Sequence, residues 1–173
     1  MQKDGRPAAQ NSNACWDLLI RNAVVFDGSG QLPFSGDVAV ADGRIAQIGE
    51  GLDPSRSREC VDARGQWLTP GLLDIHTHLD LEVELDPRLP EVVRHGTTTV
   101  VMSNCSLGLA YGAQLRNGEN PIVDCFARVE NVPKAVLQKV VDQVDWQDSE
   151  GYLAHLRQLP LGPNVVQMIP HSM

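Results

Sequence analysis

The first part of the chain alternates apolar and polar residues in short runs that are separated by turn signals. Asp27-Gly28-Ser29-Gly30 closes the first run, and Asp42-Gly43 is the strongest short hairpin signal in the chain. Alternation with a period of two predicts β-strands, so we expect short antiparallel strands with no helix among them. These strands are expected at residues 17–26, 36–41, 44–49, 59–63 and 66–69.

The pattern changes after Pro70-Gly71, where compact apolar runs alternate with stretches of helical spacing. Strands are expected at residues 72–76, 97–103 and 164–169, and helices at residues 89–94, 133–144 and 149–159. The nearly continuous apolar character of these strands is typical of strands that are buried on both faces. Alternation of strand and helix predicts parallel β/α units with right-handed crossovers.

These patterns divide the chain into three expected regions. Residues 1–15 lack periodicity and are predicted to be a disordered leader, and residues 16–69 form a small β-domain. Residues 70–173 hold three β/α units, whereas an eight-stranded barrel needs roughly 200–250 residues. We therefore expect the N-terminal portion of a longer protein. The alternative is an open three-stranded sheet, which would leave an apolar strand edge unpaired.

Composition narrows the choice of protein class. The 173 residues include 14 Lys plus Arg and 22 Asp plus Glu, and 42% are hydrophobic, which fits an ordinary globular chain and argues against wholesale disorder. A net charge of −8 without a basic stripe argues against a nucleic-acid partner. No apolar run approaches the roughly 18 residues of a membrane span, and the N-terminus has no signal-peptide core. We expect a cytoplasmic protein without a membrane partner.

The four cysteines are scattered, which favours reduced thiols over a disulfide framework. Three of them have no placement that points to a role, and we interpret them as packing or incidental residues. They are Cys15, Cys60 and Cys125.

His76-Thr77-His78 directly follows the first buried strand of the second region. Side chains at positions i and i+2 of a strand share one face, so both imidazoles are expected to point the same way. The carboxyl end of a barrel strand is where catalytic groups lie, and paired neutral imidazoles suit a divalent transition metal, zinc first. Asp74, two residues earlier, is a candidate to orient an imidazole from outside the ligand shell.

Cys105 follows the next buried strand in the same way. A thiolate at that point would be a strong zinc ligand and would be deprotonated by the metal. The alternative is a small buried apolar residue, which is the usual role of a free cysteine. Because a His-x-His pair ends the preceding strand, we favour the ligand interpretation for Cys105.

No ligand role is predicted for the acids that follow the histidine pair or for the other histidines. The three acids that alternate after the histidine pair are expected to face solvent on a loop; these are Asp80, Glu82 and Glu84. His95 and His155 are expected to be surface or helix-capping residues, and nothing matches His171 to a ligand position.

Two stretches resemble a known family. The run Leu68-Thr-Pro-Gly-Leu-Leu-Asp-Ile-His-Thr-His78 resembles the entry strand of the amidohydrolase superfamily. The run His95-Gly-Thr-Thr-Thr-Val-Val-Met-Ser-Asn-Cys105 narrows this to the N-acyl-D-amino-acid deacylases, also called D-aminoacylases. Asp86-Pro87 and Val129-Glu-Asn-Val-Pro133 are similar to that family too, and the resemblance covers roughly residues 16 to 173.

The resemblance implies an α/β fold, the N-terminal part of a metal-dependent (β/α)8 hydrolase barrel preceded by a small β-sandwich-like domain. It implies hydrolysis of the linear amide of an N-acyl-D-amino acid, a small-molecule substrate, with one or two Zn²⁺ ions in the full-length enzyme. Cys105 would be a zinc ligand together with two later histidines, and His76 and His78 would serve a second, often weakly occupied, metal position. A later Asp would shuttle the proton, so no catalytic residue is identified in this portion.

The chain departs from the family pattern at Leu79, where many members have Asp, and at Ser106, where Gly is common. Because the later histidines, the shuttling Asp and a carboxylate-binding Arg have no counterpart here, we expect little or no activity from the 173 residues alone. Two alternatives stay open. One is a cyclic-amide hydrolase similar to dihydropyrimidinase or dihydroorotase, and the other is a truncated, non-catalytic homologue.

Overall fold

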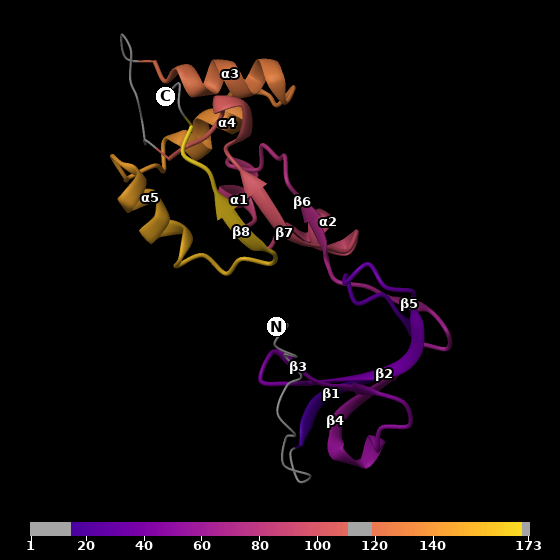
Figure 1. Ribbon diagram of the computed structural model, residues 1–173. Coiled ribbons are helices and arrows are strands. Elements are labelled where there is room, and N and C mark those ends of the chain that lie inside the picture. Colours follow the sequence, from indigo (N-terminus) through magenta and orange to yellow (C-terminus); the bar gives the residue numbers. More distant parts are fainter. Residues whose placement is uncertain (1–14, 111–118, 171–173) are drawn as a thin grey trace, which may run out of the picture. The chain divides into compact units, whose positions relative to one another are not determined.

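The computed structural model describes residues 15–110 and 119–170 (Figure 1). The chain forms two compact units that divide between Pro70 and Gly71. All but the last residue of the expected leader lies outside the described residues, and that last residue, Cys15, is exposed. No helix in the described parts is long and apolar enough to cross a membrane.

The first unit is a five-stranded sheet in the order β3-β2-β1-β4, with β5 also paired to β1. Its elements are β1 (Trp16–Val25), β2 (Phe34–Ala41), β3 (Arg44–Gly49), the 3₁₀ turn η1 (Pro54–Arg56), β4 (Ser57–Asp62) and β5 (Trp67–Leu68). The predicted hairpin between β2 and β3 is present, with Asp42 and Gly43 at positive φ. All five strands fall where the alternation predicts them, within two residues at each end.

The expectation of purely antiparallel pairing is wrong for the last two strands. Both β4 and β5 run parallel to β1, with Trp16 opposite Ser57 and Val24 opposite Trp67. The reason is the connection after β3, where η1 brings the chain back to the starting end of β1 before β4 begins. Local alternation of side chains does not encode this direction.

A buried carboxylate organises the centre of the first unit. Asp37 is 3% exposed and accepts hydrogen bonds from the backbone N–H groups of Asn22, at 2.9 Å, and Leu52, at 2.9 Å. Asn22 lies in a bulge of β1 and has a φ of 55°. The carboxylate therefore provides hydrogen-bond acceptors for a backbone N–H group in the bulge of β1 and for another in the loop after β3.

The second unit contains a parallel sheet in the order β6-β7-β8, formed by Leu72–Asp74, Thr97–Met102 and Asn164–Gln167 (Figure 1). Its helical elements are α1 (Glu82–Leu85), α2 (Pro90–Arg94), η2 (Asn104–Ser106), α3 (Pro121–Val129), α4 (Lys134–Val141) and α5 (Ser149–Leu156). Strand and helix alternate as predicted, and the parallel direction agrees with the predicted β/α units.

Two of the α-helices, α1 and α3, are not among the predicted helices. α1 is a single turn inside the acidic segment, where a loop is expected. α3 begins with two local signals that favour a helix start. Asn120 accepts a hydrogen bond from the N–H of Ile122 at 3.1 Å, and Pro121 occupies the first helical turn.

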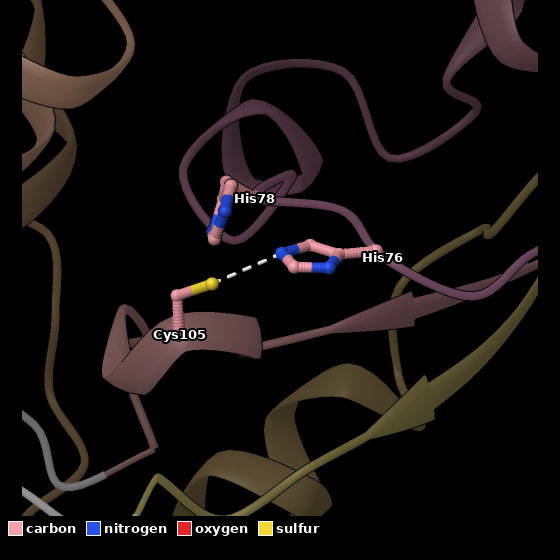
Figure 2. A group of neighbouring side chains, drawn as sticks. All are labelled: His76, His78 and Cys105. Carbon is pink, nitrogen blue, oxygen red and sulfur yellow. Dashed lines mark hydrogen bonds between the residues drawn. The ribbon is translucent and has the colours of Figure 1, made fainter.

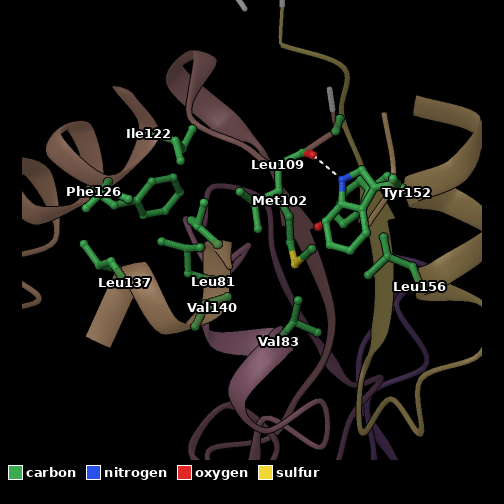
Figure 3. Close-up of a cluster of buried hydrophobic side chains, with 14 of the residues drawn as sticks. Leu81, Val83, Met102, Leu109, Ile122, Phe126, Leu137, Val140, Tyr152 and Leu156 are labelled. Carbon is green, nitrogen blue, oxygen red and sulfur yellow. Dashed lines mark hydrogen bonds between the residues drawn. The ribbon is translucent and has the colours of Figure 1, made fainter. Parts of the chain in front are cut away.

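The core of the second unit lies against one face of its sheet (Figure 3). Val100 and Met102 of β7 are fully buried there among side chains of the surrounding helices. Trp146 packs in this cluster and donates its indole N–H to the carbonyl of Leu109 at 2.7 Å. The other fully buried members include Val83, Leu89, Leu109, Phe126 and Tyr152.

The opposite face carries apolar side chains that remain accessible. Leu73 is opposite Thr99, and Val166 is opposite Val101, so these four residues share the face that Val100 does not use. Leu73 is 67% exposed and Val166 is 49% exposed. The expectation of strands buried on both faces is therefore wrong for the described residues, because their helices pack on a single face.

Candidate metal centre

The candidate ligands lie at one edge of the parallel sheet. His76 and His78 follow β6, and Cys105 lies in η2, which begins two residues after β7 ends. Because neighbouring parallel strands end at the same edge, residues that are far apart in sequence meet there. The three side chains point toward one another from these two connections (Figure 2).

The separations of these atoms are compatible with one shared metal ion. The nitrogen and sulfur ligand atoms of His76, His78 and Cys105 all lie within 4.8 Å of one another. His76 Nε2 is 3.0 Å from Cys105 Sγ, and the two imidazole centroids are 5.4 Å apart. Tetrahedral zinc with ordinary bond lengths places its nitrogen and sulfur ligands about 3.5 Å apart.

The chemistry of the donors also fits a metal. Two imidazoles and a thiolate are typical zinc ligands, and three protein ligands leave a position open, as in catalytic zinc sites. His78 Nδ1 is buried and has no hydrogen-bond partner among the described residues. An unpartnered buried nitrogen is costly unless another group binds it. Cys105 is exposed, which contradicts the alternative of a small buried apolar residue.

Thr77 fixes the segment that carries both histidines. Its backbone N–H and its hydroxyl both donate to the carbonyl of Val101, at 3.1 Å and 2.8 Å. Thr77 is 7% exposed and extends the pairing of β6 with β7 beyond the end of the strand. With the residue between them anchored inward, His76 and His78 are directed to the other side, toward Cys105.

Cys105 lies in a strained turn. Ser103, Cys105 and Ser106 have φ values of 65°, 53° and 66°, which is the left-handed region that favours glycine. Each such residue costs on the order of 1 kcal/mol. Asn104 supports the turn by donating from its amide to the carbonyl of Val101 at 2.9 Å. The turn is held by contacts with its surroundings and not by local preference.

Asp74 contacts the main chain of the site. Its side chain is exposed and accepts a hydrogen bond from the backbone N–H of His76 at 3.3 Å. The contact constrains the backbone that carries the imidazole, while a role in orienting the ring itself stays a prediction.

The expectation that Asp80 and Glu84 face solvent is wrong. Asp80 is fully buried and accepts hydrogen bonds from Ser103, and burial raises the pKa of its carboxyl group. Burial also raises the pKa of Glu84, whose carboxylate lies 2.7 Å from His155 Nε2. Both carboxylates point into the unit because each has a hydrogen-bond partner there: Ser103, which follows β7, for Asp80, and His155 of α5 for Glu84. Glu82 is exposed, as expected.

The other histidines and cysteines do not join the centre. His95 is exposed at the end of α2, as expected, whereas His155 is partly buried and stacks on Trp146 at 4.6 Å between ring centroids. His171 lies outside the described residues. The remaining free cysteines are all exposed, so the packing interpretation does not hold for Cys15, Cys60 and Cys125.

Comparison with known proteins identifies relatives of both units. Residues 2–63 match the family described as the urease alpha-subunit, N-terminal domain. An uncharacterized protein of Mycobacterium tuberculosis (strain H37Rv) is 43% identical over 159 residues, which cover 91% of this chain and 25% of the relative. The N-acyl-D-aspartate deacylase of Alcaligenes xylosoxydans xylosoxydans is 37% identical over 105 residues, which cover 61% of this chain and 21% of that enzyme.

A solved structure extends the similarity to the fold. The N-acyl-D-glutamate deacylase of Bordetella bronchiseptica, crystallised with zinc and a phosphonate mimic of the tetrahedral intermediate, matches with a TM-score of 0.70 and 29% identity. The match covers 91% of this chain and 30% of the enzyme. The chain thus spans about a quarter of the length of the curated relatives it matches.

Proposed function

Since the chain is the counterpart of the N-terminal portion of the N-acyl-D-amino-acid deacylases in the amidohydrolase superfamily, we propose that it supplies part of a zinc-dependent amide hydrolase. Residues 16–69 would be the N-terminal part of its small β-domain. Residues 70–173 would be the first three β/α units of its barrel. We further propose that the substrate is a small N-acyl-D-amino acid and that the protein works in the cytoplasm.

The observation that carries the proposal is the convergence of His76, His78 and Cys105 within 4.8 Å at the carboxyl edge of a parallel sheet. The two histidines would bind as neutral imidazoles and Cys105 as a thiolate, with Thr77 holding the histidine segment against β7. If Zn²⁺ were held there, it would lower the pKa of a coordinated water to about 7 and would polarise the amide carbonyl of the substrate. One or two ions would serve the whole enzyme.

Zinc binding tests the ligand set directly. Equilibrium dialysis of the 173-residue chain should show bound Zn²⁺, and Cys105→Ser should weaken that binding at least tenfold because a thiolate ligand is lost. Cys125→Ser is the matched control, since Cys125 is also exposed and belongs to the same unit. Equal zinc content in all three proteins would refute the proposed centre.

Hydrolysis tests the substrate class. Release of free amine from N-acetyl-D-amino acids should be slow or absent for the zinc-loaded 173-residue chain, because the resemblance assigns the proton shuttle to a later Asp. Any hydrolysis should favour the D over the L enantiomer and should fall with Cys105→Ser. Faster turnover of dihydropyrimidines than of linear amides would favour the cyclic-amide alternative instead.

A further inference from the structure

A polar cluster, in which Asp80 and Ser103 are buried and Gln167 is half-buried, lies at the carboxyl ends of β6, β7 and β8. Asp80 follows β6, Ser103 follows β7, and Gln167 ends β8. Asp80 Oδ2 accepts the backbone N–H of Ser103 at 3.1 Å, and Asp80 Oδ1 accepts the Ser103 hydroxyl at 2.5 Å. Gln167 donates its amide Nε2–H to the same hydroxyl oxygen.

The cluster is adjacent in sequence to each part of the candidate metal centre. Asp80 comes two residues after His78, and Ser103 comes two residues before Cys105. Both oxygens of Asp80 contact the same residue, so the carboxylate joins the two connections that carry the ligands. Asp80 and Ser103 are 0% and 2% exposed, which shields these hydrogen bonds from water.

Ser103 is also where the strained turn begins. Its φ of 65° turns the chain away from β7 and leads into the left-handed Cys105. A serine at positive φ persists only where its surroundings determine that conformation. Here the buried carboxyl group of Asp80 accepts hydrogen bonds from both the N–H and the hydroxyl of Ser103. Leaving this conformation would break both hydrogen bonds inside the protein.

Close packing fixes the pair from the other side. A Cβ atom at Gly108 would lie 2.1 Å from the Ser103 hydroxyl oxygen and 3.1 Å from Asp80 Oδ1. The backbone after η2 therefore closes directly over the carboxylate and the hydroxyl. Any side chain at position 108 would push Ser103 out of place.

We propose that Asp80 is a positioning residue that holds the Cys105 turn against the histidine pair. The inference rests on the proposed function, because it takes the same three side chains as the metal ligands. Asp80 is not one of the side chains whose ligand atoms gather within 4.8 Å of one another, and both of its oxygens accept hydrogen bonds from Ser103. It acts by fixing where the thiolate stands relative to the two imidazoles.

Cobalt binding tests this role, because a thiolate–Co²⁺ bond gives a charge-transfer absorption band that reports on Cys105 itself. In the 173-residue chain, Asp80→Ala should weaken Co²⁺ binding 10- to 100-fold and reduce the band, the size expected when a supporting partner of a ligand is removed. Asp80→Asn and Ser103→Ala, which each keep part of the network, should weaken binding by a smaller factor. Denaturant unfolding should show whether each variant is folded.

Val83→Ala is the matched control for instability alone. Val83 is fully buried and lies three residues after Asp80, yet it has no part in the polar cluster. It should lower the stability of the same unit while leaving the affinity and the band of the folded protein unchanged.

The outcomes separate the two proposals. Loss of the band in Cys105→Ser, with wild-type binding in folded Asp80→Ala, would overturn the positioning role and leave the metal centre standing. If Asp80→Ala does not fold, wild-type binding in both Asp80→Asn and Ser103→Ala would overturn it equally. Absence of a thiolate band in the wild-type chain would overturn both proposals.

Discussion

The two faces of the β6-β7-β8 sheet have similar apolar residues but very different surroundings. On one face Val100 and Met102 are fully buried against the helices, and Figure 3 shows Met102 in this cluster. On the other face Leu73 and Val166 are 67% and 49% exposed. The side chains are of the same kind, so the difference arises from what packs on each face and not from strand composition.

This difference shows what a strand sequence does and does not specify. Parallel strands that are covered on both faces are apolar throughout, and β7 has that composition although one of its faces is open. An apolar open face is expected if further parts of a barrel pack there, which agrees with our proposal that the chain supplies only some of its units. Substitutions on the covered face and on the open face test this difference through the free energy of unfolding. A further substitution tests a carboxylate that is buried near the covered face.

The largest effect is expected on the covered face. Met102→Ala should lower the free energy of unfolding of the second unit by about 2–4 kcal/mol, because it removes a fully buried side chain and leaves a cavity. Urea denaturation followed by tryptophan fluorescence measures this change, since Trp146 belongs to the same core. A loss below about 0.5 kcal/mol would mean that the covered face is not a packed core.

The elements of the fold were largely predictable from the sequence. β7 was expected at residues 97–103 and occupies Thr97–Met102, because its run of β-branched and apolar residues allows few other structures. The convergence of His76, His78 and Cys105 also followed from the sequence, because parallel strands end at one edge. Strand direction in the first unit did not follow, because a connecting turn decides it.

Buried polar residues were the main failure of the sequence-based interpretation. Asp80 and Glu84 were expected in solvent because an alternating acidic run usually indicates a solvated segment. Their burial depends on Ser103 and His155, which are 23 and 71 residues away in the sequence. No local pattern identifies such partners, so the polar cluster of Asp80 and Ser103 next to the candidate metal centre became visible only in the structure.

A smaller effect concerns the carboxylate buried on the covered face, where Glu84 contacts His155. Burial raises the pKa of Glu84 and outweighs the hydrogen bond and charge of His155, which lower it, while Asp145 and Asp80 act in the same direction as burial. A raised pKa means that the folded state holds this proton more tightly than the unfolded state. The stability contributed by Glu84 is therefore present at low pH and is lost as the pH rises through its folded pKa.

Glu84→Gln should remove this contribution and flatten the dependence of stability on pH above the ordinary range of a glutamate. Urea midpoints measured between about pH 4 and pH 7 test the difference in slope between the variant and the wild type. Glu82→Gln is the control, because Glu82 is exposed in the same helix and should leave the slope unchanged. Identical slopes for wild type and Glu84→Gln would contradict the assigned burial effect.

The smallest effect is expected on the open face, where the same substitution can be compared across the sheet. Val166→Thr should change the free energy of unfolding by less than about 0.5 kcal/mol, because the new hydroxyl remains hydrated and threonine keeps the branched shape that strands favour. Val100→Thr, on the covered face of the neighbouring strand, should cost about 1–3 kcal/mol because its hydroxyl is buried in an apolar core. Urea denaturation of the two variants measures both values. Equal losses would show that the open face is covered in solution, and the contrast between the two faces would then have to be abandoned.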